Sequence, residues 1–161
     1  MRLIIEAYLV DDEGSTERTQ LASIERSLTT DPLGMSLAEC KALLAAAQQH
    51  LVDSQCQGIA SAHAHCERCD AKLGLKGWHQ RQIKTVFGLV IVQSPRVHYC
   101  RCANKPAGAS FSPLAQVVPT SMTPELEYLQ VKWAAHLSYA VATALLSEVL
   151  PTADTISVSG V

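Results

Sequence analysis

Residues 66–102 of this chain read CERCDAKLGLKGWHQRQIKTVFGLVIVQSPRVHYCRC, with a cysteine pair at each end. Cys66 and Cys69 have two residues between them, and Cys100 and Cys102 have one. In a zinc ribbon, two tight turns each present two thiolates, and the strands between them bring the turns together around a tetrahedral ion. We therefore predict a zinc-ribbon-like unit in which these four cysteines bind one structural Zn²⁺. The metal would stabilise a sheet that is too small to bury much apolar surface.

Other uses of these cysteines stay open. A thioredoxin-like redox pair expects C-x-x-C in a βαβ unit, whereas this pair follows a predicted helix and precedes turns. An iron–sulfur cluster could also use four cysteines, and the thiols could remain uncoordinated. His63, His65 or His98 could replace one cysteine ligand, since each lies close to a pair in the sequence. A catalytic zinc keeps an open position, usually with His or carboxylate ligands, so four cysteines favour a structural site.

The segment between the cysteine pairs is rich in β-branched residues and has turn signals at Gly88 and at Ser94-Pro95. We expect three short strands joined by tight turns, at about 82–87, 89–93 and 96–100. Residues 103–122 are rich in Pro, Ala and Ser, and we expect them to form a connecting loop.

A β-hairpin is expected at the N-terminal end, where an acidic turn separates two arms within residues 3–26. The second arm could equally form a short helix. Asp11, Asp12 and Glu13 are adjacent in the turn and point in different directions, so we interpret them as a solvated loop rather than a metal site.

A long helix is expected from residue 37 to about residue 64. Ser36 can cap it, and Glu39 three residues later completes a capping box. Cys40 and Cys56 lie on this helix, sixteen residues apart, with no partner at ligand spacing. We interpret both as helix thiols.

A pair of helices is expected near the C-terminal end. Thr123 can cap the first, Pro124 fits its first position, and Ser138 can break it before a second helix over 139–149 that ends at Pro151. A third helix would begin near Ile156 or Ser157. This order resembles the start of a helix-turn-helix, in which the last helix enters the major groove.

Together these patterns predict an α+β fold in three parts. They are a hairpin with a long helix (1–65), a zinc-ribbon-like unit (66–105), and a linker with an incomplete helix-turn-helix (106–161). Hydrophobic residues make up 48% of the chain, but no apolar run is long enough to cross a bilayer and no secretory signal is evident. We expect a cytoplasmic location and no membrane partner.

Positive charge is concentrated in one segment. The whole chain has a formal net charge of −2, yet residues 66–105 carry eight basic and two acidic side chains, whereas residues 1–65 carry four basic and nine acidic ones. A local basic surface matters more for phosphate binding than the total charge. The side chains that we expect to contact DNA are Arg68, Lys72, Lys76, His79, Arg81, Lys84, Arg96 and Arg101. The alternative is that these cations simply keep a small sheet soluble.

The chain resembles a known family in several stretches. The most specific are K-G-x-H-x-R from Lys76, T-V-F-G from Thr85, S-P-R from Ser94 and C-x-C from Cys100, followed by FSPLA and TPELEYL at 111–115 and 123–129. A further stretch is LGMSLAECKALLAAAQQHLV at 33–52. These stretches and their order are similar to the N-terminal region of ISKra-family insertion-sequence transposases. The resemblance covers nearly the whole chain.

The resemblance implies a DNA-rearranging enzyme whose N-terminal part, with a zinc-ribbon-like element and a helix-turn-helix, grips the terminal repeats of the element. It implies a metal role for the four cysteines and makes Lys76, His79, Arg81 and Arg96 motif positions. The family continues past the position of Val161 into an RNase H-like domain, where three acidic residues bind two divalent metals for strand transfer. No set of acids in this sequence replaces that triad, so we expect no strand transfer by this chain alone.

Three functional hypotheses follow from the sequence. The first is a DNA-binding and structural part of a transposase that recognises element ends in DNA transposition. The second is a protein-interaction module that forms a homo-oligomer or docks onto an intact transposase, a hypothesis based on the Ala-rich helix over 37–64 and the expected partial helix after Pro151. The third is a thiol oxidoreductase.

Overall fold

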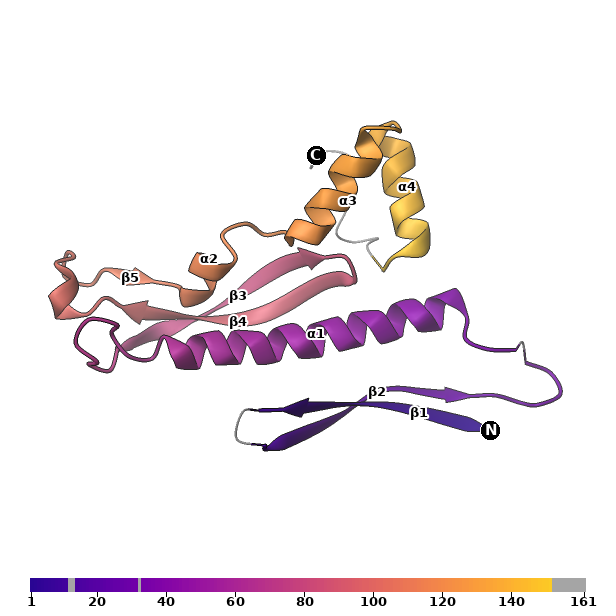
Figure 1. The fold of residues 1–161 in the computed structure, drawn as a ribbon, viewed down its shortest axis with the longest axis horizontal. Helices are drawn as coiled ribbons and strands as arrows, with labels where there is room; N and C mark the ends of the chain where they lie inside the picture. The colour runs from indigo at the N-terminus through magenta and orange to yellow at the C-terminus, as the bar shows by residue number, and fades with distance from the viewer. Residues whose placement is uncertain (12–13, 32, 152–161) are drawn as a thin grey trace.

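The centre of the structure is a long antiparallel hairpin of β3 (Leu75–Thr85) and β4 (Gly88–His98), shown in Figure 1. This computed structural model describes residues 1–11, 14–31 and 33–151. The two strands are joined at Val86 and Phe87, where the Thr85 hydroxyl donates to the Gly88 carbonyl at 2.8 Å. Gly88 has a φ of 117°, a conformation that favours glycine.

The expectation of three short strands is wrong in two respects. β3 begins at Leu75 and not near residue 82, and β4 continues through Ser94 and Pro95 without a break. Ile91 directs its backbone groups away from β3, toward α1 (Leu37–Ala62). Backbone direction alternates along a strand, so Pro95, four residues later, has the same orientation as Ile91. Its missing N–H therefore removes no hydrogen bond from the β3–β4 ladder, and the strand tolerates the proline.

Other segments form hydrogen bonds with parts of both outer edges of the hairpin. The Gln49 side-chain amide on α1 donates to the Ile91 carbonyl at 3.2 Å and accepts from its N–H at 3.3 Å. Beyond that point, β5 (Ser110–Phe111) pairs with the end of β4. On the β3 side, Lys84 exchanges backbone hydrogen bonds with residues 121 and 123. These contacts shorten the unpaired edges of the hairpin, although on β3 the backbone hydrogen bonds are confined to Lys84 among the described residues.

Helix α1 forms as the sequence predicts. The capping box of Ser36 and Glu39 is present, and the helix ends at Ala62 with His63 as its C-cap. One face of α1 packs on the hairpin through Cys56, which joins a buried cluster with Ile83, Val90, Val92 and Leu114. Residues from all three predicted parts of the chain share this core.

Residues 103–122 are more ordered than the expected connecting loop. They contain β5 and a short helix, α2 (Pro113–Val117), which Ser112 caps by accepting from the Ala115 N–H. Leu114 on α2 is only 2% exposed. Burial of this side chain against α1 and β4 overrides the turn signals of the surrounding sequence.

The predicted C-terminal helical pair is confirmed as α3 (Pro124–Ala134) and α4 (Tyr139–Val149). Leu126 and Leu146 form a second buried cluster with Val86 at the hairpin turn. The Lys41 ammonium donates to the Ser147 carbonyl at 2.7 Å and so connects α1 to α4. The predicted third helix near Ile156 lies outside the described residues.

The N-terminal residues form a separate two-stranded sheet of β1 (Arg2–Val10) and β2 (Thr16–Glu25). The second arm is thus a strand and not a helix. In the turn, the Asp11 carboxylate accepts from the Ser15 N–H at 2.7 Å, whereas Asp12 and Glu13 lie outside the described residues. The predicted α+β class is therefore confirmed. Across the described ranges, no helix combines the length and apolarity needed to cross a membrane.

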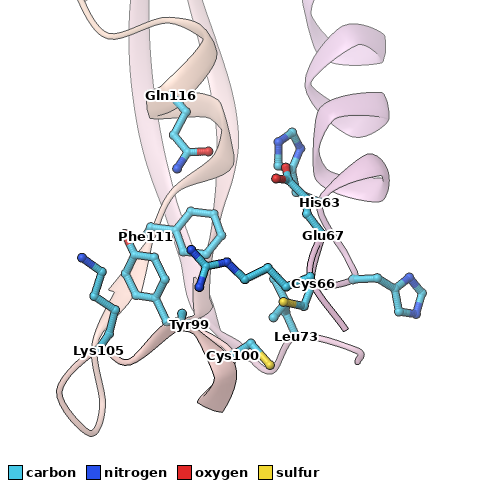
Figure 2. A pocket seen from close by; sticks show the side chains of 12 residues that line it. His63, Cys66, Glu67, Leu73, Tyr99, Cys100, Lys105, Phe111 and Gln116 are labelled. Carbon is cyan, nitrogen blue, oxygen red and sulfur yellow. The ribbon is translucent and has the colours of Figure 1, made fainter. Parts of the chain in front are cut away.

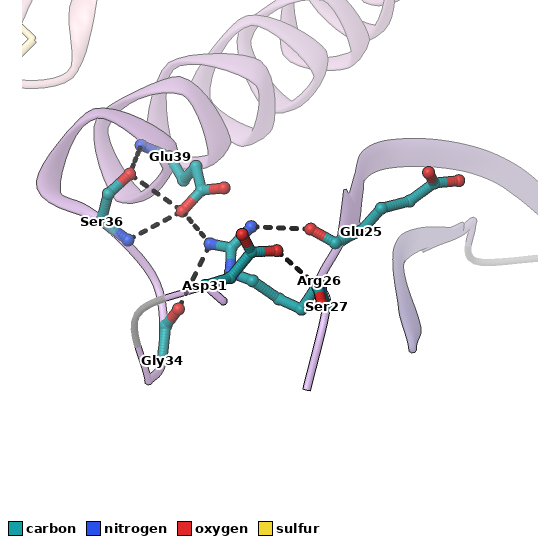
Figure 3. A network of polar contacts seen from close by, with 7 residues as sticks. All are labelled: Glu25, Arg26, Ser27, Asp31, Gly34, Ser36 and Glu39. Atoms are coloured by element: carbon teal, nitrogen blue, oxygen red, sulfur yellow. Dashed lines mark hydrogen bonds and ion pairs between the residues drawn. The ribbon is translucent and has the colours of Figure 1, made fainter. Parts of the chain in front are cut away.

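A polar network fastens this β1–β2 hairpin to the start of α1 (Figure 3). Arg26, which directly follows β2, forms an ion pair with Glu39 and donates to the Gly34 carbonyl at 3.2 Å. Glu39 also accepts from the Ser36 N–H at 2.7 Å and from its hydroxyl at 2.8 Å. These hydrogen bonds lower the pKa of Glu39 from 4.5 to about 2. The bond from Arg26 has the largest effect, and those from Ser36 come next.

The Glu39 carboxylate should make stability dependent on acid pH. A group whose folded-state pKa is lowered contributes stability above its unfolded pKa and loses it as the pH falls through the folded value. We expect Glu39→Gln to be less stable than the wild type at neutral pH, with the difference shrinking as the pH falls from about 4.5 toward 2. Urea unfolding followed by circular dichroism at several pH values measures this difference.

Glu17→Gln, at an exposed position of β2, is the matched control and should show no such convergence. A pH-independent difference for Glu39→Gln would contradict the assignment.

Candidate metal centre

The first cysteine pair lies in a tight turn between α1 and β3. We call residues 65–72 the first knuckle. The Asp70 N–H donates to the Cys66 carbonyl at 2.8 Å, and the Cys66 N–H donates to the Ala71 carbonyl at 2.9 Å. Asp70 has a φ of 57°, in the left-handed region that Asp tolerates better than most residues. This turn presents Cys66 and Cys69 on the same side of the chain.

The second pair lies in a turn that follows β4. We call residues 99–105 the second knuckle. The Ala103 N–H donates to the Cys100 carbonyl at 2.9 Å, and Asn104 reverses the chain with a φ of 49°. Because β3 begins and β4 ends on the same side of the hairpin, the two knuckles lie next to each other. We call this side the knuckle end.

The four thiols converge at the knuckle end. The Cys66 and Cys102 Sγ atoms are 3.4 Å apart, those of Cys69 and Cys100 are 3.4 Å apart, and those of Cys69 and Cys102 are 3.6 Å apart. All four Sγ atoms lie within 4.8 Å of one another, and all are free thiols. The structure therefore brings together the four cysteines that the sequence proposes as ligands, in an arrangement that could hold a metal ion.

The histidines near the cysteines do not join this group in the part of the chain that the structure describes. The His63 Nδ1 lies 2.9 Å from the Ile59 carbonyl, at the end of α1. His65 forms a backbone bridge with Lys72 across the first knuckle. Cys40 and Cys56 lie on α1, as expected, and Cys56 is buried in the core.

The thiols differ in how easily they lose a proton. The pKa of Cys66 is lowered to about 7, mainly by the backbone N–H of Arg68 and then by the Cys102 thiol and the Cys69 N–H. The pKa of Cys102 is raised to about 12, because it shares hydrogen bonds with Cys66, Cys100 and Cys69. The Cys66 thiolate forms readily, whereas Cys69 and Cys102, whose pKa is raised, resist further negative charge. A cation at the centre would remove this resistance and release protons on binding.

The predicted DNA contacts fall into two groups. One group lies at or beside the knuckle end with exposed side chains: Arg68, Lys72, Lys76, Arg96 and Arg101. The other lies farther along β3 and consists of His79, which is exposed, with Arg81 and Lys84, which are half-buried. The Arg81 guanidinium donates to the Val118 carbonyl and, at 2.7 Å, to the Thr120 carbonyl, so it holds the segment after α2 against β3. Their roles in DNA binding stay predictions.

A cavity of about 290 Å³ lies between the two knuckles (Figure 2). One wall consists of the Tyr99 and Phe111 rings, whose centroids are 4.7 Å apart with a tilt of 34°. The Lys105 Nζ lies 5.7 Å from the centre of the Tyr99 ring. The sequence reasoning missed these three residues. The position of Lys105 in the basic segment could have indicated that residue, and the position beside Cys100 could have indicated Tyr99.

No protein-family model, curated protein or solved structure matches this chain. A functional proposal therefore depends on the residues and their geometry.

We expect purified protein to bind one metal ion per chain at the four cysteines. Cys69→Ser should lose the metal and lower the thermal stability of the knuckle end, because three thiolates cannot close a four-ligand site. Cys40→Ser, which changes a half-buried thiol on α1, is the matched control and should retain the metal. Elemental analysis measures the stoichiometry, and a pH indicator in weak buffer measures the protons released on metal addition. Equal metal content in the two variants would contradict the assignment.

Proposed function

We propose that this chain is a DNA-binding and structural element of a transposase, similar to the N-terminal region of ISKra-family transposases, and that it recognises the ends of the element. We propose further that its four cysteines hold one structural Zn²⁺ in a zinc ribbon. The observation that carries the proposal is the convergence of the four thiols at the end of the hairpin where exposed basic side chains gather.

The distances between the thiols support zinc over a cluster of several irons. Zn–S bonds of about 2.3 Å in a tetrahedron place the sulfur atoms about 3.8 Å apart. The closest Sγ–Sγ distances here are 3.4 to 3.6 Å, and none exceeds 4.8 Å. A cluster of several irons has inorganic sulfide between the metals and so spreads its cysteines farther apart. Four thiolates also leave no open position, which is typical of a structural site.

The charge of the knuckle end supports phosphate binding. A Zn²⁺ ion with four thiolates carries a net charge of −2, which lowers the formal charge of residues 66–105 from +6 to +4. Part of the positive charge therefore offsets the metal centre, and an excess remains. Lys72, Arg96 and Arg101 are exposed and make no ion pair within the described residues. They are available for phosphate oxygens.

The helical pair supports the helix-turn-helix part of the proposal. Helices α3 and α4 are joined by a short turn at residues 135–138 and contact each other. Apolar side chains remain exposed on both helices, including Val131 at 60% and Val149 at 62%. A third helix packed on such side chains would complete the motif.

The DNA-binding proposal predicts a steep salt dependence. Metal-loaded protein should bind a short duplex of random sequence at low salt and release it as salt rises, because most contacts would be to phosphate. Each lost phosphate contact should reduce the slope of log K against log salt by about 1. Lys72→Gln and Arg96→Gln should each show this change in fluorescence anisotropy titrations. Arg2→Gln, on the acidic β1–β2 hairpin, is the control and should keep the wild-type slope. Absence of binding at low salt would count decisively against the proposal.

The alternative is a protein-interaction module, and one observation favours it. Leu37, Leu44 and Leu51 follow each other at seven-residue intervals on α1 and are 54%, 41% and 47% exposed. This spacing keeps them on one side of the helix, as in a helix–helix seam. The packing of α1 on the hairpin uses another side, which includes Cys56 and Val52.

The interaction module predicts self-association through this stripe. We expect a dimer in sedimentation velocity experiments, and Leu44→Glu should convert it to a monomer because a charge would then lie in the middle of an apolar contact. Ala42→Glu places the same charge at an exposed position on a different side of α1 and should leave the dimer intact. A wild-type protein that stays monomeric at high concentration, with or without an intact transposase, would rule out this alternative.

A further inference from the structure

We propose that the cavity between the knuckles binds one unpaired nucleobase together with its phosphate, so that the knuckle end holds a single-stranded part of the DNA. This inference rests on the proposed DNA-binding function and specifies the form of DNA that the metal-bound end takes.

The shape of the cavity fits a single base. Its volume of about 290 Å³ is at the small end of ligand pockets, which measure about 300–1,000 Å³. The Tyr99 and Phe111 rings form one wall, and His63 and Glu67 line the opposite side, at the end of α1 and on the first knuckle (Figure 2). A duplex is too wide to enter this space, whereas one unstacked base can lie between the two walls.

The chemistry of the walls favours a base over a free anion. The paired rings of Tyr99 and Phe111 are half-buried and supply an aromatic surface on which a base of any sequence can stack. Glu67 and Gln116 can form hydrogen bonds with the edge of a base. Glu67 and the cysteine sulfurs, in contrast, make the interior unfavourable for an unaccompanied phosphate.

The cations of the cavity suit the phosphate that accompanies the base. Arg68 on the first knuckle and Lys105 on the second both line the cavity. Both side chains are exposed, so their charged groups remain accessible to a nucleic-acid backbone in solvent. A cavity with an aromatic wall and flanking cations is the combination that single-stranded nucleic acid requires.

The metal centre would hold the two walls at a fixed separation. The aromatic wall is attached to Cys100 through Tyr99, and the opposite wall is attached to Cys66 through Glu67. Both cysteines belong to the four-thiol group. One ion bound to both knuckles therefore fixes the width of the cavity, so single-stranded binding should depend on metal more strongly than duplex binding does.

The test compares a short oligo(dT) strand with a blunt duplex, using fluorescence anisotropy on the metal-loaded 161-residue chain. Loss of one base–aromatic stack weakens binding by about tenfold or more. The Tyr99 ring is covered by Phe111 and by the Lys105 ammonium, so the ring that faces the cavity is Phe111 (Figure 2). We expect Phe111→Leu to bind oligo(dT) about tenfold more weakly and the duplex nearly as well as the wild type. Phe111→Tyr, which keeps an aromatic ring, should bind oligo(dT) like the wild type. Tyr8→Leu removes an exposed tyrosine from the β1–β2 hairpin and should change neither affinity.

Metal content is measured for every variant, and Lys105→Ala serves if Phe111→Leu loses its metal. Lys105→Ala should also weaken oligo(dT) binding more than duplex binding. The inference is overturned if the wild type binds the duplex but not oligo(dT), or if metal-loaded variants bind oligo(dT) as tightly as the wild type. A wild type that binds neither DNA overturns the proposed function as well, so the two failures are distinguishable.

Discussion

Four thiols converge at one end of the β3–β4 hairpin, and neither buried apolar cluster of the described residues lies there. The first cluster, around Val90 and Val92, lies along the hairpin under α1, and the second, around Leu126, lies at its turn. The knuckle end therefore has little apolar burial with which to fix the end of α1, the start of β3 and β5 to one another. A metal ion on the four cysteines would supply that connection, because binding energy at such a site adds directly to folding energy.

The hairpin also sets the distance between the two regions proposed to handle DNA. The knuckles lie at one end and the α3–α4 pair at the other (Figure 1). Each strand has 11 residues, which at about 3.4 Å per residue span roughly 35 Å. One turn of B-DNA is about 34–36 Å long, so under the proposed function the two ends can reach positions about one turn apart. A rigid hairpin of this length would hold the α3–α4 pair and the knuckle end at a constant separation. Duplex DNA bound at one end and an unpaired base bound at the other would then stay about one helical turn apart.

The sequence predicted the features whose signals are local. Cysteine spacing indicated the thiol cluster, the Ser36–Glu39 capping box indicated α1, and the Thr123-Pro124 pair indicated the start of α3. It failed where a tertiary contact decides the outcome. Pro95 is a turn signal, yet it lies within β4 because its missing N–H faces away from β3. Phe111 and Leu114 lie in a stretch that resembles a loop, and only packing against Tyr99 and the core orders them.

The separation of charge along the chain gives any bound DNA a preferred side. Residues 1–65 carry a formal charge of −5, and their acidic side chains are concentrated on or near the β1–β2 hairpin. That hairpin lies on the opposite side of α1 from β3 and β4 (Figure 1). Under the proposed function, this separation of charge would repel phosphate groups from one side of the molecule and attract them to the knuckle end, and so would orient an approaching duplex before contact. The exposed leucines of α1 would then remain accessible to another protein chain, so the proposed DNA binding does not exclude the alternative of helix pairing through this stripe.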